Sequence, residues 1–98
     1  MIAPAGGGPA PGFPRALDFA PGAVRALRKL PGPVAATLLD ALEAYAATGV
    51  GDVRRLAGVR PPEYRLRVGE YRVRFAQLDS GTSGRVTVLW IGHRRDAY

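Results

Sequence analysis

Residues 64–75 alternate between apolar side chains and arginines on both sides of a short Gly69-Glu70 break. A period of two is typical of a β-strand, in which successive side chains point to opposite faces. Glycine at the first position of a two-residue loop favours a type II′ turn, because that position needs a positive φ angle. The pattern therefore predicts a β-hairpin with one apolar face and one arginine face.

Two helices are predicted upstream, where they can cover the apolar face. Residues 23–30 place apolar side chains at helical spacing, and the Pro31-Gly32-Pro33 break ends this segment because proline cannot continue the helical hydrogen bonds. Pro33 suits the first turn of a second helix, which runs to Gly49. The apolar stripe of that helix consists of Val34, Leu38, Leu42 and Tyr45. We expect the two segments to form an antiparallel helical hairpin.

Further strands are expected before the helices and after the β-hairpin. Residues 15–19 fit a short first strand, residues 53–58 a connector and residues 79–84 a loop. Residues 85–91 are strongly apolar and fit a central strand, with Trp90 in the core. This order predicts a small α+β domain with a helical hairpin packed on one face of an antiparallel sheet. At 98 residues, the chain has room for one such domain.

Residues 1–14 differ in composition from the rest, since eleven of them are Gly, Pro or Ala. Such a segment has no periodicity and little apolar surface to bury. We therefore expect a disordered tail over residues 1–14 and a folded domain over residues 15–98. The three consecutive glycines do not make a phosphate-binding loop, because they lack the Lys-Ser/Thr pair of that motif.

Several classes of site are excluded by residues that are absent or occur once. The chain has no cysteine, which excludes disulfides, zinc ribbons and thiol catalysis, and its one histidine, His93, cannot build a histidine-rich metal site. The apolar runs are far shorter than the ~20 residues of a membrane-spanning helix, and the N-terminus lacks the pattern of a secretion signal. We expect a cytoplasmic protein that uses no metal and no cofactor.

Positive charge is concentrated in the second half of the chain. Fourteen Lys and Arg residues against eight Asp and Glu give a net charge of +6. Residues 50–98 hold ten basic and five acidic groups, whereas residues 1–49 hold four and three. A GC-rich coding sequence would favour arginine over lysine, but it does not account for the clustering. A basic half indicates a polyanionic partner, such as nucleic acid, an acidic protein or an anionic membrane surface.

The predicted β-hairpin gathers four arginines on one face. With a two-residue loop, Arg67 lies opposite Arg72, and Arg65 lies opposite Arg74. Like charges in directly opposite positions destabilise a sheet. A bound anion would offset this repulsion, and the planar guanidinium fork suits phosphate. The alternative is a solvated outer face on which the arginines splay apart.

The C-terminal residues 92–98 bring further polar groups toward this face. They contain Arg94, Arg95, the histidine and a terminal tyrosine. The ring of Tyr98 can stack on a nucleobase, and histidine is a residue type suited to proton transfer near neutral pH. A lone histidine at a strand end is nevertheless more often structural than catalytic.

Two C-terminal motifs resemble those of the RelE/ParE superfamily of bacterial type II toxins. They are YRLRVGEYRV at residues 64–73 and IGHRRDAY at residues 91–98. Upstream, ALRKLP at residues 26–31 and VRRLAG at residues 53–58 match the helix and connector usual in that family. The resemblance covers about residues 16–98. It implies a short strand, a helical hairpin and a curved antiparallel sheet.

A RelE-like member would be an mRNA interferase that an antitoxin neutralises. The resemblance implies metal-independent cleavage of mRNA in the ribosomal A site, in which the RNA 2′-hydroxyl attacks the adjacent phosphate and leaves a 2′,3′-cyclic phosphate. Such a reaction needs phosphate positioning, charge stabilisation and proton transfer.

The resemblance also assigns roles by position. Arg65 and Arg67 match the two catalytic basic residues of one strand, and Arg72 matches the arginine that clamps the scissile phosphate. Arg94 matches the C-terminal catalytic arginine, and Tyr98 matches the terminal catalytic tyrosine. His93 and Arg95 are adjacent candidates, and Arg74 is expected to bind RNA.

Two other functions remain open at the level of the sequence. A ParE-like toxin shares the fold but inhibits DNA gyrase, and a non-catalytic member would only bind RNA or an acidic protein. The joint presence of Arg72, Arg94 and Tyr98 favours the nuclease. The general base is not assigned among His93, Tyr98 and a perturbed basic group.

Overall fold

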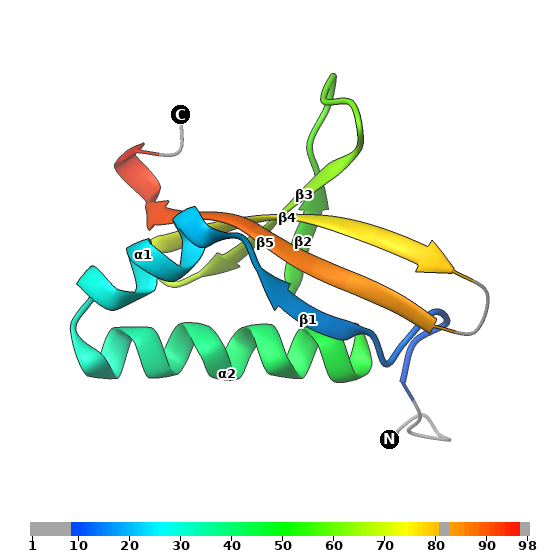
Figure 1. Ribbon diagram of the computed structural model, residues 1–98, viewed down its shortest axis with the longest axis horizontal. Helices are drawn as coiled ribbons and strands as arrows, with labels where there is room; N and C mark the ends of the chain where they lie inside the picture. The colour runs from blue at the N-terminus through cyan, green and yellow to red at the C-terminus, as the bar shows by residue number, and fades with distance from the viewer. Residues whose placement is uncertain (1–8, 81–82, 97–98) are drawn as a thin grey trace.

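Five strands form one mixed sheet, with the order β1-β5-β4-β3-β2, in the computed structural model (Figure 1). The structure describes residues 9–80 and 83–96. The strands are β1 (Ala16–Phe19), β2 (Asp52–Arg55), β3 (Glu63–Val68), β4 (Tyr71–Ser80) and β5 (Ser83–His93). Strand β1 runs parallel to β5, and the other neighbouring strands are antiparallel. The predicted α+β class is confirmed, although the sheet is mixed rather than wholly antiparallel.

Two helices pack on the sheet, and a short 3-10 turn follows it. Helix α1 (Pro21–Lys29) packs on β5, and α2 (Gly32–Thr48) runs lengthwise beneath the sheet (Figure 1). Helix α1 begins two residues before the predicted start, because proline is well tolerated in the first turn of a helix. Helix α2 ends as predicted at Gly49, which adopts φ 84° and donates its N–H to the Tyr45 carbonyl. A 3-10 turn (Arg94–Asp96) follows β5.

Two segments predicted to be irregular are strands. The connector expected at residues 53–58 begins with β2, an edge strand that pairs with β3. The loop expected at residues 79–84 is shorter, because β4 extends to Ser80 and β5 begins at Ser83. In both places the pairing of the backbone with a neighbouring strand overrides a sequence rich in turn-forming or charged residues.

The central β-hairpin has the predicted register. Arg67 pairs with Arg72, and Arg65 pairs with Arg74. Gly69 has φ 56°, and glycines are the only residues with positive φ among those that the structure describes. A positive φ at the first loop position alone is the requirement of a type II′ turn. The turn therefore fixes which side chains face the helices.

Substitution of Gly69 by alanine is expected to destabilise the protein by about 1 kcal/mol, since a side chain at this φ is strained. Gly32→Ala in the first turn of α2 is the matched control. A Cβ at residue 32 meets nothing within 4 Å, and the backbone φ there is negative. The Gly32→Ala variant should therefore be as stable as the wild-type protein or slightly more stable. Urea denaturation of both variants measures the difference. Equal stabilities would contradict the assigned turn.

The core lies between α2 and the inner face of the sheet. Phe75 is fully buried at its centre, with its ring 5.3 Å from the Tyr45 ring and 5.6 Å from the Tyr64 ring. The predicted stripe of α2 supplies Leu38, Leu42 and Tyr45 to this core, and Val34 packs against it. These contacts hold the β-hairpin with its arginine face outward.

A β-bulge changes which residues of β5 face the core. Arg74 pairs with Trp90, but the next residue of β4, Phe75, pairs with Val88, so Leu89 is left as the extra residue. Because Phe75 is buried and Arg74 lies on the opposite face, Trp90 lies on the arginine face. The prediction that Trp90 belongs to the core is wrong.

The described part of the N-terminal segment is in contact with the domain. The N–H of Ala10 donates to the Thr48 carbonyl at 2.9 Å, and the Phe13 ring packs edge-on against Tyr45 at 5.1 Å. These two contacts connect residues 10 and 13 to the C-terminal end of α2, where Phe13 finds an aromatic partner. Residues 1–8 lie outside the described residues, and the division between tail and domain stays a prediction.

Candidate functional site

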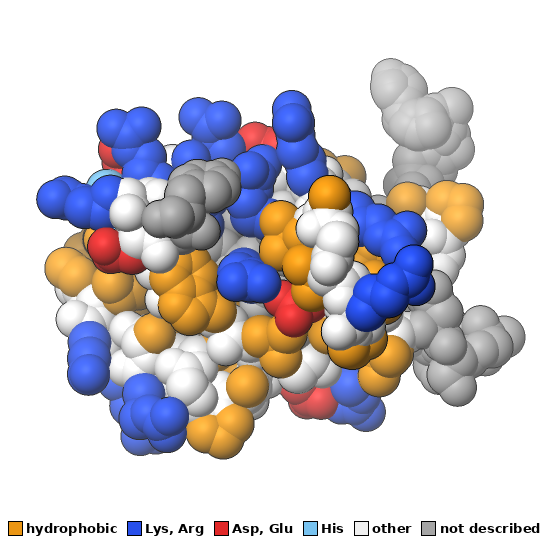
Figure 2. Space-filling model, turned by 90° about the horizontal axis from the view of Figure 1, so that it is seen from above, with side chains coloured by type: hydrophobic (Ala, Val, Ile, Leu, Met, Phe, Trp, Pro, Cys, Tyr) orange, Lys and Arg blue, Asp and Glu red, His pale blue; other side chains and the backbone are white. Residues whose placement is uncertain are grey.

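Two rows of paired residues cross the outer face of the sheet, which is the face turned away from α2. Directly paired residues point to the same side of a sheet, so each row projects from one face. The Trp90 row consists of Arg54, Arg65, Arg74 and Trp90, and the Gly92 row consists of Asp52, Arg67, Arg72 and Gly92. Figure 2, which views the molecule from the side opposite α2, shows basic side chains spread over this face.

Arg72 is the only buried charged residue that the structure describes, with 6% of its surface exposed. Its Nη1 donates to the carbonyl oxygens of Gly69 and Tyr71, each at 3.0 Å. Its Nε is buried and has no hydrogen-bond partner among the described residues. Buried donors are normally satisfied, and this guanidinium N–H remains available to an acceptor oxygen of a ligand.

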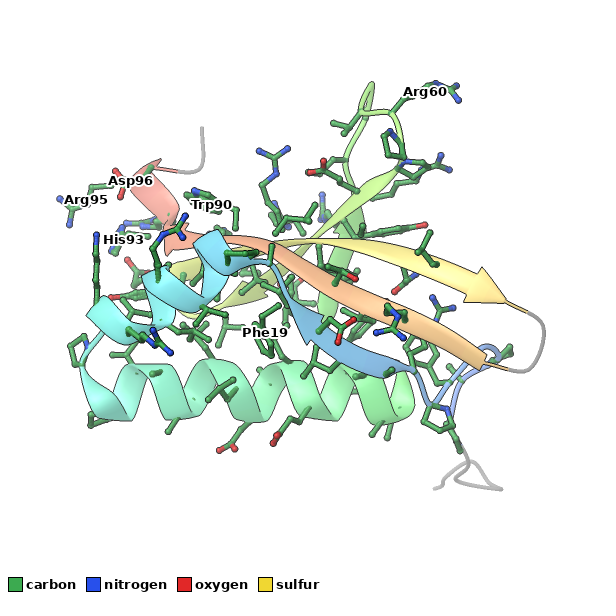
Figure 3. All side chains as sticks on the ribbon, viewed as in Figure 1. Phe19, Arg60, Trp90, His93, Arg95 and Asp96 are labelled. Carbon is green, nitrogen blue, oxygen red and sulfur yellow. The ribbon has the colours of Figure 1, made fainter. Side chains whose placement is uncertain are left out.

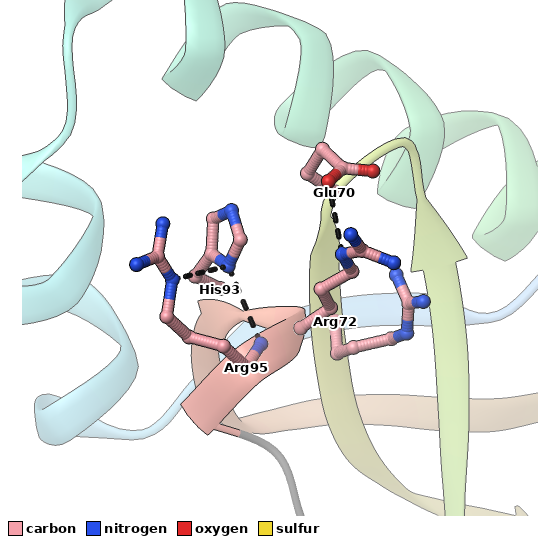
Figure 4. Close-up of a pocket in the computed structure, with 5 residues that line it drawn as sticks. Glu70, Arg72, His93 and Arg95 are labelled. Carbon is pink, nitrogen blue, oxygen red and sulfur yellow. Dashed lines mark hydrogen bonds and ion pairs between the residues drawn. The ribbon is translucent and has the colours of Figure 1, made fainter.

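An open cavity of about 560 Å³ lies beside Arg72 (Figure 4). Its lining comprises three arginines, one histidine and one carboxylate: Arg72, Arg94, Arg95, His93 and Glu70. With His93 neutral, these groups carry a net formal charge of +2. The structure thus brings together four of the predicted site residues, namely Arg72, His93, Arg94 and Arg95. An anion entering the cavity would meet several donors at once.

Glu70 links the hairpin turn to the C-terminal 3-10 turn. Its carboxylate Oε1 lies 2.9 Å from Nε of Arg94, and its carbonyl oxygen accepts a 2.7 Å hydrogen bond from the Arg94 N–H. Both side chains remain more than half exposed, at 63% for Glu70 and 58% for Arg94. The backbone bond positions Arg94, whereas the exposed ion pair is weak enough to be exchanged for a ligand anion.

His93 faces the helices rather than the arginine rows. It pairs with Tyr71, and the two rings meet edge-on at 5.5 Å. Nδ1 of His93 accepts hydrogen bonds from the backbone N–H and Nε of Arg95, both at 3.3 Å. With Nδ1 as the acceptor, the neutral ring carries its hydrogen on Nε2, so Nε2 can donate to a ligand oxygen.

The remaining arginines of the predicted site lie on the outer face, away from the cavity lining. Arg74 is held by Glu63, whose Oε1 lies 2.9 Å from its Nη2. Arg67 is exposed, and Arg65 is half-buried. They form an extended basic surface beside the cavity. Tyr98 lies outside the described residues.

Sequence reasoning missed two residues of this region, Glu70 and Trp90. Glu70 was assigned only to the turn, and no local pattern in the sequence shows that the C-terminal segment returns to it. The sequence predicts Trp90 in the core because it is flanked by the apolar residues Leu89 and Ile91. A bulge at Leu89 turns Trp90 to the outer face, and no glycine lies between residues 85 and 90 to indicate it.

Within residues 9–80 and 83–96, no three or more His, Cys, Asp or Glu side chains are grouped so that they could hold a metal ion. In the same part of the chain, no helix combines the length and the apolar character needed to cross a membrane.

The arrangement of helices and strands matches the fold of chains in solved toxin-antitoxin complexes. A chain of the archaeal RelE-RelB complex from Pyrococcus horikoshii OT3 matches with a TM-score of 0.68 and 23% identity, over 87% of this chain and 100% of that one. A chain of the toxin-antitoxin complex RelBE2 from Mycobacterium tuberculosis matches with a TM-score of 0.62 and 24% identity, over 84% and 100%.

A third match is to the RelB-RelE antitoxin-toxin complex from Methanococcus jannaschii. Its TM-score is 0.56 at 21% identity, over 83% of this chain and 94% of that one. No protein-family model and no curated protein matches the sequence. At these identities the likeness establishes the fold, and it confirms the RelE-like fold predicted from the C-terminal motifs.

Proposed function

We propose that this protein is a RelE-type toxin that cleaves mRNA in the ribosomal A site and is neutralised by a cognate antitoxin. The observation that carries the proposal is the buried Arg72, whose Nε has no partner among the described residues and which lies beside a cavity lined by further arginines. The fold supports the same function, since the similar chains come from RelE-RelB and RelBE2 complexes.

The proposed reaction uses the cavity as a phosphate site. The 2′-oxygen of the RNA forms a bond to the adjacent phosphorus, the bond from phosphorus to the 5′-oxygen breaks, and the product is a 2′,3′-cyclic phosphate. One proton leaves the 2′-hydroxyl and one reaches the departing 5′-oxygen. Arg72 and Arg94 would bind the non-bridging oxygens and stabilise the charge that develops on them.

Two features of the cavity shape this proposal. A phosphate that binds Arg94 would compete with the Glu70 carboxylate for the same guanidinium. His93, with its hydrogen on Nε2, suits a donor to a phosphate oxygen, and it would have to give up its Arg95 hydrogen bonds before Nδ1 could accept a proton. Tyr98 and the outer arginines, Arg65, Arg67 and Arg74, would contact the mRNA around the cleaved bond.

An antitoxin partner is part of the proposal. The basic surface favours a partner segment with acidic side chains, which would cover the arginines that otherwise bind RNA. Reversing the charge of Arg72 and Arg94 should weaken such a complex at low salt. Unchanged affinity would contradict this binding surface.

Induced expression in a bacterial host tests the nuclease directly. The expected result is growth arrest, with in-frame cuts in a translated mRNA mapped by primer extension. The control is the same mRNA without its start codon, which should stay intact because the reaction depends on translation. Arrest with no mRNA cuts would instead favour inhibition of DNA gyrase, and folded protein that causes neither would indicate a non-catalytic member of the fold.

A further inference from the structure

Trp90 lies on the outer face of the sheet among arginines. It belongs neither to the buried core cluster nor to the partly buried residues packed against that cluster. Figure 3 shows its ring on the side of the sheet away from α2. A tryptophan buries more apolar surface than almost any other side chain, so its position outside the core needs a separate explanation.

The backbone of Gly92 makes room for the Trp90 ring. A Cβ at residue 92 would lie 2.4 Å from both Cη2 and Cζ2 of the indole, closer than real Cβ atoms approach. The ring can therefore lie along β5, over the backbone of Gly92, only because that residue is glycine. A ring held against the backbone loses little conformational freedom when a ligand packs on it.

The ring also lies at the end of the arginine rows. Trp90 pairs with Arg74, and Gly92, over which the ring extends, pairs with Arg72. Neighbouring strands are about 5 Å apart, so Trp90 lies on the same face as Arg74 and Arg72 and one strand away from them. An aromatic ring beside a row of cationic side chains is the combination by which proteins hold single-stranded nucleic acids: the cations bind phosphates, and the ring stacks on a base.

We propose that Trp90 is a stacking platform for one nucleobase of single-stranded RNA, whose phosphates bind to the arginines of the two rows. The proposal rests on the proposed function for its RNA ligand, but it requires no cleavage. It gives Trp90 a binding role distinct from phosphate binding in the cavity. The competing structural role is a ring that only shields the backbone of β5.

The single tryptophan of the chain makes the contact directly measurable. The full-length protein is titrated with a single-stranded 2′-O-methyl RNA, which lacks the attacking hydroxyl, and with a matched oligonucleotide whose residues are abasic. Stacking predicts saturable quenching of indole fluorescence by the base-bearing RNA, and none by the abasic RNA at concentrations that also bind. Equal quenching by both, or no quenching at saturation, would overturn the proposal.

Variants at two positions separate stacking from support of the fold. Trp90→Leu is expected to weaken RNA binding about 5- to 100-fold, whereas Trp90→Phe keeps a ring and should lose less. Gly92→Ala displaces the ring without removing it and should weaken binding in the same direction. Anisotropy of a labelled RNA measures the affinities, and circular dichroism confirms folding. Wild-type affinity in a folded Trp90→Leu variant would overturn the stacking role.

Failure of this proposal can be distinguished from failure of the nuclease. In-frame mRNA cuts by a protein whose tryptophan fluorescence is not quenched would support the proposed nuclease activity and contradict base stacking on Trp90. Base-dependent quenching of the tryptophan fluorescence in a protein that does not cut mRNA would support base stacking on Trp90 and contradict the proposed nuclease activity. If Trp90→Leu does not fold, the fluorescence titration of the wild-type protein still tests whether a base stacks on Trp90.

Discussion

Replacement of both Arg72 and Arg94 by alanine is expected to lower the rate of mRNA cleavage at least about 100-fold, and to abolish growth arrest. The reason is electrostatic: both guanidinium groups line the cavity, and the double variant removes two of its three full positive charges. Primer extension on a translated mRNA, together with cleavage rates on programmed ribosomes, measures the loss.

The matched control removes the same charge elsewhere. Arg55 and Arg60 are exposed near the β2–β3 connection, and Arg60 lies far from His93 and Arg95 (Figure 3). Arg55→Ala/Arg60→Ala should keep most of the cleavage rate. Because Arg72 also binds two carbonyls of the turn, thermal melting has to show that the Arg72→Ala/Arg94→Ala variant is folded at the assay temperature. Equal loss of cleavage in both double variants would mean that net charge, not the cavity, governs activity.

Leu42→Ala is expected to destabilise the protein by about 2–5 kcal/mol, because Leu42 is fully buried and its truncation leaves a cavity between α2 and the sheet. A native domain is stable by only about 5–15 kcal/mol, so this change removes a large part of the total. Guanidinium denaturation gives the free energy of unfolding.

The control for this prediction is chemically identical. Leu78 is 62% exposed on β4, so Leu78→Ala should change stability by less than about 0.5 kcal/mol. A loss at Leu78 as large as the loss at Leu42 would show that another molecule or segment covers the exposed leucine in solution. A small loss at Leu42 would contradict the packing of α2 on the sheet.

The β-hairpin and the helices were predictable because their determinants are local. The alternation around Gly69-Glu70 fixed the strand register, since a shift of one residue would bury arginines and expose the apolar face. The stripe on α2 and the proline and glycine at its ends fixed that helix in the same way. These local features predict which face of the sheet carries the arginines, and therefore where the candidate site lies.

Four of the five residues that line the cavity are predicted from the sequence: Arg72 by the alternation of the hairpin, and residues 93–95 by their polar side chains and by the resemblance of the C-terminal motif to RelE-like toxins. Only the folded chain shows that the Arg94 N–H reaches the Glu70 carbonyl. This contact joins segments that have no common periodicity. Because of this contact, the Glu70 carboxylate lines the cavity together with the arginines.

The sequence by itself determined the α+β class, the register of the hairpin and the gathering of arginines on one face, because side-chain period, turn chemistry and charge are local properties. Tertiary structure decided the orientation of Trp90, the edge strand β2 and the attachment of residues 9–14. A bulge at Leu89 turns Ile91 into the core and Trp90 out of it. Such a bulge depends on how β5 fits β4 and the layer beneath them, and that fit exists only once distant segments have packed together.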